Sequence, residues 1–178
     1  MRTLIESTFL SLDGMVSNPE AWSMPYWNEE HQSYSQRLLE PAEGLVLGRE
    51  TYEGFAETWP TMSGDPYTDK MNALPKYVAS RTLTEATWNA QILQGDAVEA
   101  VAALKQEGDG TLLKFGTGPF SYDLLAAGLL DELHLWYFPV LSGVGEHLAP
   151  IGEITHLELA DTVRFDSGIV VLVLRPKA

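Results

Sequence analysis

The sequence predicts an α/β fold, with a mainly parallel central sheet flanked by helices and a C-terminal antiparallel hairpin. Short apolar runs alternate with segments of helical periodicity through most of the 178 residues. The last two apolar runs are separated by Asp166-Ser167-Gly168, which is a hairpin signal. Since parallel strands need long crossover connections, the helical segments between the earlier runs are what a parallel sheet requires.

The expected elements follow from these patterns in chain order. Strands are predicted where short apolar runs occur: 4–10, 44–48, 76–80, 88–93, 112–115, 133–138, 156–164 and 169–174. Helices are predicted where apolar residues recur every three or four positions: 27–39, 49–58, 97–106 and 119–127. Two stretches between them, 18–25 and 60–69, are polar and rich in proline and are expected to be loops, the second of them mobile.

Capping signals place the ends of the later helices. Pro119 occupies the preferred first position of a helix, and Gly128 supplies a stop after it. Asp96 and Glu99 form a start signal that resembles a capping box, and Gly108 follows the end of that helix. The sequence contains neither an internal repeat nor a linker, so residues 1–178 are expected to form one domain.

Composition disfavours several kinds of partner and excludes chemistry that depends on cysteine. The formal net charge is −14, which disfavours binding to nucleic acid or to an anionic membrane. The absence of cysteine rules out disulfides, thiolate metal sites and cysteine nucleophiles. The four histidines show no metal-ligand spacing, so no metal is expected. The N-terminus lacks the uninterrupted apolar core of a signal peptide, and no run is long enough to cross a bilayer, so a cytoplasmic protein is expected.

Three polar turns each follow a predicted strand directly. In a parallel sheet such turns gather at the carboxyl edge, where ligands bind. The residues concerned are Gly48, Arg49 and Thr51, then Ser80, Arg81 and Thr82, and finally Gly116, Thr117 and Gly118. The last group opens a helix and presents free backbone N–H groups at the positive end of its dipole, which suits a nucleotide phosphate.

Each turn also has an alternative interpretation. A G-x-G sequence after a strand is as often a tight turn as a phosphate site. Arg49 in the first turn of a helix is disfavoured unless an anion is present, but it could pair with Glu53. Ser80, Arg81 and Thr82 suit a phosphate monoester, and their alternative is a solvated turn. The convergence of three turns on one edge favours the ligand-binding interpretation.

Fewer residues indicate where a substrate would bind. Asp13 lies in an apolar turn, so its pKa could be raised and it could act as a proton donor. The alternative is that Asp13 with Gly14 only forms the turn. Trp22, Tyr26 and Trp27 could wall a pocket and stack on a flat substrate, or equally pack in the core beside the first helix.

Several of these motifs, in order and in register, resemble the bacterial dihydrofolate-reductase-like proteins that share the fold of the C-terminal reductase domain of the riboflavin-biosynthesis deaminase–reductase. The resemblance spans about Leu4 to Leu174. The matching segments are SLDGMV (11–16), LGRETYEGF (47–55), MNALPKYVASRTL (71–83), FGTG through LLAAGLLDELHL (115–135) and PVLSGVG (139–145).

This resemblance implies a dihydrofolate-reductase-like fold and NADPH as the cofactor. It implies that Gly116, Thr117 and Gly118 lie against the cofactor diphosphate, which the Gly48–Thr51 segment contacts from another side. Ser80, Arg81 and Thr82 would receive the 2′-phosphate, and Asp13 would lie near the nicotinamide. Met15 and Glu146 depart from the pattern of the riboflavin reductases, which leaves the substrate open.

The resulting prediction is an NADPH-dependent oxidoreductase, similar to dihydrofolate reductase and to 5-amino-6-(5-phosphoribosylamino)uracil reductase. It would transfer a hydride to a small pterin- or pyrimidine-like heterocycle, with Asp13 as the candidate proton donor. One alternative is a non-catalytic nucleotide-binding or regulatory module on the same fold. A third possibility is an interaction domain whose aromatic-rich terminal strands form a homodimer. A homodimer formed through the terminal strands is compatible with the reductase interpretation.

Overall fold

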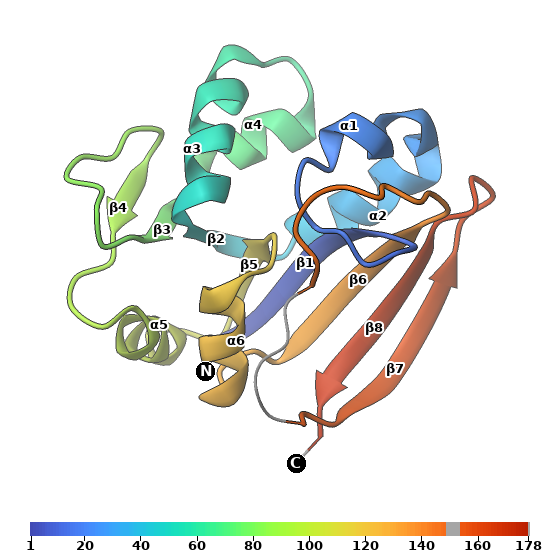
Figure 1. Ribbon diagram of the computed structural model, residues 1–178. Coiled ribbons are helices and arrows are strands. Elements are labelled where there is room, and N and C mark those ends of the chain that lie inside the picture. The colour runs from blue at the N-terminus through green and yellow to red at the C-terminus, as the bar shows by residue number, and fades with distance from the viewer. Residues whose placement is uncertain (149–153, 178) are drawn as a thin grey trace.

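Eight strands form one twisted sheet through the middle of the molecule (Figure 1). The computed structural model describes residues 1–148 and 154–177. The strand order is β4-β3-β2-β5-β1-β6-β8-β7. The strand bounds are β1 Thr3–Ser11, β2 Ala42–Gly48, β3 Lys76–Ala79, β4 Ala90–Ile92, β5 Thr111–Phe115, β6 Glu132–Phe138, β7 Leu157–Arg164 and β8 Val170–Pro176.

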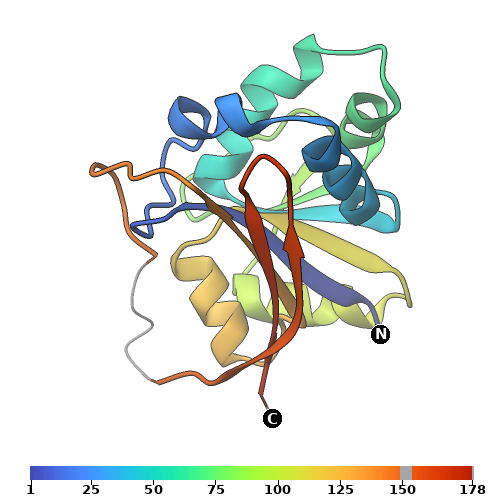
Figure 2. The same cartoon turned by 90° about the vertical axis from the view of Figure 1, so that its right-hand side faces the viewer.

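All strand pairs from β4 to β6 are parallel, and β8 then pairs antiparallel with both β6 and β7. Helices cover both faces: α1 to α4 lie on one face, and α5 and α6 on the other (Figures 1 and 2). The α-helices are α1 Glu20–Ser23, α2 Glu29–Leu39, α3 Arg49–Thr58, α4 Pro66–Ala73, α5 Ala97–Gln106 and α6 Pro119–Ala126. The described residues also contain two 3₁₀ turns, η1 Met24–Tyr26 and η2 Trp59–Thr61. The predicted fold class is confirmed.

The apolar residues of β2 show why its sequence is a continuous hydrophobic run. Successive side chains point to opposite faces of a strand, and both faces of this sheet are covered by helices. Leu45 and Leu47 therefore belong to one buried cluster together with Tyr34 of α2. Val46 belongs to a second cluster, on the other face, together with Leu124 of α6.

The predicted strands and helices are present, with bounds that differ by a few residues. The expected loop over 60–69 is wrong in its second half, because α4 begins at Pro66. Asp65 caps that helix by accepting a hydrogen bond from the Thr68 N–H at 3.0 Å, and Met71 anchors it in the core. The expected loop over 18–25 likewise contains the short helix α1.

Candidate functional site

The three polar turns lie at neighbouring positions on the carboxyl edge of the sheet. β3, β2 and β5 are adjacent parallel strands, so their carboxyl ends reach the same edge. Gly48 is paired with Ala79, the residue before Ser80, and Val46 is paired with Lys114, two residues before Gly116. The nine residues of the three turns therefore lie along the same edge of the sheet, as expected from the sequence.

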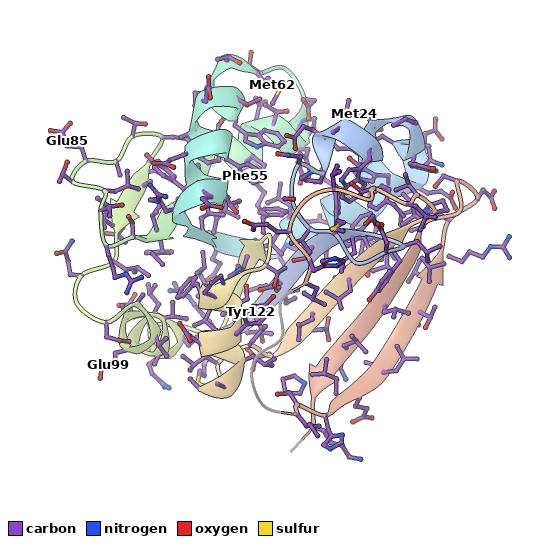
Figure 3. All side chains as sticks on the ribbon, in the orientation of Figure 1. Met24, Phe55, Met62, Glu85, Glu99 and Tyr122 are labelled. Carbon is purple, nitrogen blue, oxygen red and sulfur yellow. The ribbon has the colours of Figure 1, made fainter. Side chains whose placement is uncertain are left out.

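Side chains of α3 connect two of these turns directly. A Cβ atom built on Gly116 would lie 3.0 Å from the Thr51 hydroxyl, so that hydroxyl rests against the glycine. Phe55 lies one turn further along α3 (Figure 3). Its ring centroid is 5.6 Å from that of Phe115, the last residue of β5. The first turn of α3 and the glycine turn after β5 thus form one continuous surface.

The glycine turn between β5 and α6 leaves backbone donors available. Gly116 has φ +71°, the left-handed region that glycine adopts at little cost, and its N–H donates to the Ser7 carbonyl at 3.1 Å. Within residues 1–148 and 154–177, the N–H groups of Thr117 and Gly118 donate no hydrogen bond. A Cβ on Gly118 would meet no described atom within 4 Å, so a ligand has room to approach these groups.

Arg49 makes the ion pair that was the alternative interpretation of this residue, but the pair is loose. Its guanidinium is 3.9 Å from the Glu53 carboxylate, and both side chains are nearly half exposed. Exposed pairs of this kind contribute about 0–1 kcal/mol. Arg49 can therefore exchange this partner for an anion at the site.

The turn after β3 combines a structural hydroxyl with an uncommitted cation. The Ser80 hydroxyl oxygen accepts hydrogen bonds from the N–H groups of Thr82, at 3.2 Å, and Leu83, at 3.0 Å. Arg81 is exposed and has no ion pair or hydrogen bond with any described residue. Ser80 shapes the turn, and Arg81 remains free to meet a ligand.

Asp13 accepts three hydrogen bonds. They come from the Ser11 hydroxyl at 2.6 Å and from the N–H groups of Gly143, at 2.8 Å, and Ser142, at 3.0 Å. These bonds, that from Ser11 foremost, lower the pKa of Asp13 from 3.8 to about 2. The expectation of a raised pKa is wrong, because the carboxylate lies among donors that stabilise its charge. The alternative interpretation, an aspartate that builds the turn, agrees with the structure.

The loop after β6 is held against the turn after β1. Besides the contacts of Asp13, the Val16 N–H donates to the Glu146 carbonyl and the Glu146 N–H donates to the Ser17 hydroxyl, both at 2.8 Å. The Leu148 N–H also donates to the Gly14 carbonyl at 2.8 Å. Asp13 therefore positions two loops at the carboxyl end of β1 and β6.

Of the three aromatic residues predicted to line a pocket, two pack against Phe138 and one is exposed to solvent. Trp22 is buried and packs edge-on against Phe138, which matches the core-packing alternative. Tyr26 packs against the same ring and donates to the Pro139 carbonyl at 3.0 Å. Trp27 is 48% exposed and stacks on His31, so it alone of the three presents a broad ring to solvent.

The prediction overlooked a buried ion pair beneath the glycine turn. Lys114 of β5 and Glu6 of β1 are register partners in the sheet, and their side chains meet at 3.0 Å. A charged residue inside each of two apolar strand patterns was the available signal.

The described residues contain no group of three or more histidine, aspartate or glutamate side chains placed to hold a metal ion. In the same part of the chain, no helix is long and apolar enough to cross a membrane.

A hollow of about 340 Å³ lies elsewhere, at the amino ends of β3 and β4, where Pro75, Thr87, Trp88 and Asn89 line it. This is the edge of the sheet opposite to the three turns. We assign the candidate site to the carboxyl edge, because the free donors and the uncommitted cation are there.

Comparison with known protein families identifies the family of this chain. The model of the RibD C-terminal domain matches residues 2–171. The chain belongs to the RibD C-terminal domain family. This confirms the resemblance to the riboflavin-biosynthesis reductases, and membership of this reductase-type family suggests an oxidoreductase.

Three similar proteins share between 14% and 27% of their aligned residues with this chain. The chain is 27% identical over 142 residues to the uncharacterized protein YyaP of Bacillus subtilis (strain 168), an alignment that covers 76% of this chain and 75% of YyaP. It superposes with a TM-score of 0.79 on a protein from Shewanella sp. PV-4 provisionally assigned to riboflavin biosynthesis, at 22% identity and 99% coverage of both chains. A pyrimidine reductase-like protein from Corynebacterium diphtheriae gives a TM-score of 0.67 at 14% identity, with 99% of this chain and 92% of that one covered. At these identities, the two solved structures establish the fold.

Proposed function

We propose that this member of the RibD C-terminal domain family is an NADPH-dependent reductase acting on a small pterin- or pyrimidine-like heterocycle. The observation that supports this most is the convergence of three polar turns on one edge of the sheet, with the Thr51 hydroxyl against Gly116. Membership of the family supports the class of reaction. The hydrogen-bond donors of the three turns support a nucleotide as the cofactor.

The residues present fit NADPH. The free N–H groups of Thr117 and Gly118 would donate to the diphosphate, and Arg49 would contact it from α3. Arg81 would pair with the 2′-phosphate, since a guanidinium binds a phosphate through two parallel hydrogen bonds. Because the formal net charge is −14, an anion would be repelled from most of the surface. Binding of NADPH therefore depends on these local groups.

When bound, NADPH supplies the hydride, and the protein holds and orients the reactants. Asp13 is ionised at neutral pH, because its pKa is about 2, so it has no proton to donate. In this proposal Asp13 instead fixes the loops after β1 and β6, which border the substrate. Trp27, through its exposed ring, is the aromatic residue available to stack on a flat heterocycle.

Titration with NADPH and NADH, followed by nicotinamide fluorescence, tests the proposal. Saturable binding of NADPH is expected, and binding of neither nucleotide would rule the reductase out. A panel of dihydropterins and aminopyrimidines should then show oxidation of NADPH with at least one compound. A protein that binds NADPH but oxidises it with none of them would instead be a nucleotide-binding module.

A further inference from the structure

A single buried ammonium group joins the two ends of the glycine turn. Lys114 is the second-last residue of β5, and its side chain is 4% exposed. Its Nζ donates to the Gly116 carbonyl and to the Ser121 hydroxyl, each at 2.6 Å. Gly116 is where the chain leaves the strand, and Ser121 lies in the first turn of α6. The ammonium therefore fixes both sides of the turn from the interior.

The bond to Gly116 also decides where the neighbouring N–H points. The carbonyl of Gly116 and the N–H of Thr117 belong to one planar trans peptide unit, so they point in opposite directions. Because Lys114 holds the carbonyl toward the interior, the Thr117 N–H faces away from the interior. This N–H is one of the two free donors of the turn.

The positive charge of Lys114 is balanced by the buried carboxylate of Glu6. The Glu6 carboxylate lies 3.0 Å from Nζ and is fully buried, and the Thr8 hydroxyl donates to its other oxygen at 3.3 Å. Buried ion pairs are poor sources of stability, because the loss of hydration cancels most of the attraction. Stability therefore does not account for an ion pair at this position. The contacts of Lys114 with the glycine turn indicate that the pair orders the turn.

We propose that Lys114 is a positioning residue for the diphosphate of NADPH, with Glu6 as its counter-ion. Lys114 holds the peptide between Gly116 and Thr117 in the orientation that offers the Thr117 N–H to a phosphate oxygen. This inference rests on the proposed function. It adds to the proposed function two buried residues, Lys114 and Glu6, that need not touch the cofactor.

The test removes both charges together, because Lys114→Met alone would leave Glu6 buried without a partner. The double variant Glu6→Leu/Lys114→Met keeps side chains of similar size. Three probes separate the parts of the site: NADPH, ADP, which has a diphosphate without a 2′-phosphate, and adenosine 2′-phosphate, which has no diphosphate. The matched control is Lys105→Met/Asp131→Asn, which removes another ion pair of a buried lysine, Lys105 of α5.

The double variant is expected to raise the Kd of NADPH and of ADP by roughly 10- to 100-fold, the effect of losing a hydrogen bond to a charged group. The Kd of adenosine 2′-phosphate should not change, and the control should bind all three probes as the wild type does. Equal binding of ADP by wild type and double variant would overturn the inference, as would equal losses for all three probes. Absence of NADPH binding to the wild type would instead overturn the proposed function.

A measurement on the wild-type protein covers the case in which the double variant does not fold. The amide resonances of Thr117 and Gly118 should shift when ADP is added, because their N–H groups become hydrogen-bonded to the diphosphate. If ADP binds and these two resonances do not move, the inference is wrong.

Discussion

Alanine at two glycines of the same turn should have opposite consequences. Gly116 has φ +71°, and a Cβ there would lie 3.0 Å from the Thr51 hydroxyl. A left-handed backbone costs a residue with a Cβ about 1–2 kcal/mol, and the Thr51 side chain must also shift. Gly118 has φ 164°, an extended conformation open to any residue, and a Cβ there meets no described atom within 4 Å. Gly116→Ala should therefore destabilise the fold, whereas Gly118→Ala should not.

The assay combines thermal unfolding with NADPH titration. For a chain of this size, 1–2 kcal/mol corresponds to a fall in Tm of roughly 2–8 °C for Gly116→Ala. Gly118→Ala should keep the wild-type Tm and lose NADPH affinity, because its methyl group occupies the space that the diphosphate needs. An unchanged Tm for Gly116→Ala would show that the left-handed backbone at this position does not exclude a Cβ atom. Normal NADPH affinity of Gly118→Ala would refute the placement of the diphosphate.

Four further outcomes are expected. Arg81→Ala should raise the Kd of NADPH roughly 10- to 100-fold and leave that of NADH unchanged, in fluorescence titrations, because only NADPH has the 2′-phosphate. The pKa of Asp13 falls from 3.8 to about 2 on folding, so its ionised form stabilises the protein above about pH 4 and this contribution is lost as the pH falls toward 2. Asp13→Asn should thus lower the Tm at pH 7, and the difference should vanish near pH 2. Burial lowers the pKa of His31 from 6.5 to about 4, so stability should fall as the pH drops from 6.5 to 4, and denaturant unfolding of His31→Phe should show less of this loss. If the predicted homodimer forms through the terminal strands, Leu159→Lys on the edge strand β7, where Leu159 is 57% exposed, should yield monomers in sedimentation.

Local patterns were sufficient for most of the secondary structure. The helices 49–58 and 97–106 were predicted with the bounds that the structure shows, because a strand end or a cap marks each start. Helix α4 was missed because the polar composition of 60–69 hid the capping aspartate Asp65 and the proline after it. Its stability comes partly from Met71 in the core, and that burial depends on the rest of the fold.

Local patterns in the sequence were enough to predict that the three turns share one edge, since any parallel sheet gathers the carboxyl ends of its strands. The roles of Asp13 and Lys114, in contrast, depend on contacts that form only in the folded chain. Asp13 meets Ser142 and Gly143, which lie 129 and 130 residues further along the chain, and these donors turn a candidate acid into a stable carboxylate. Lys114 meets Glu6 on a neighbouring strand. Strand order sets both encounters, and a pKa or a buried charge depends on neighbours in space that local sequence does not specify.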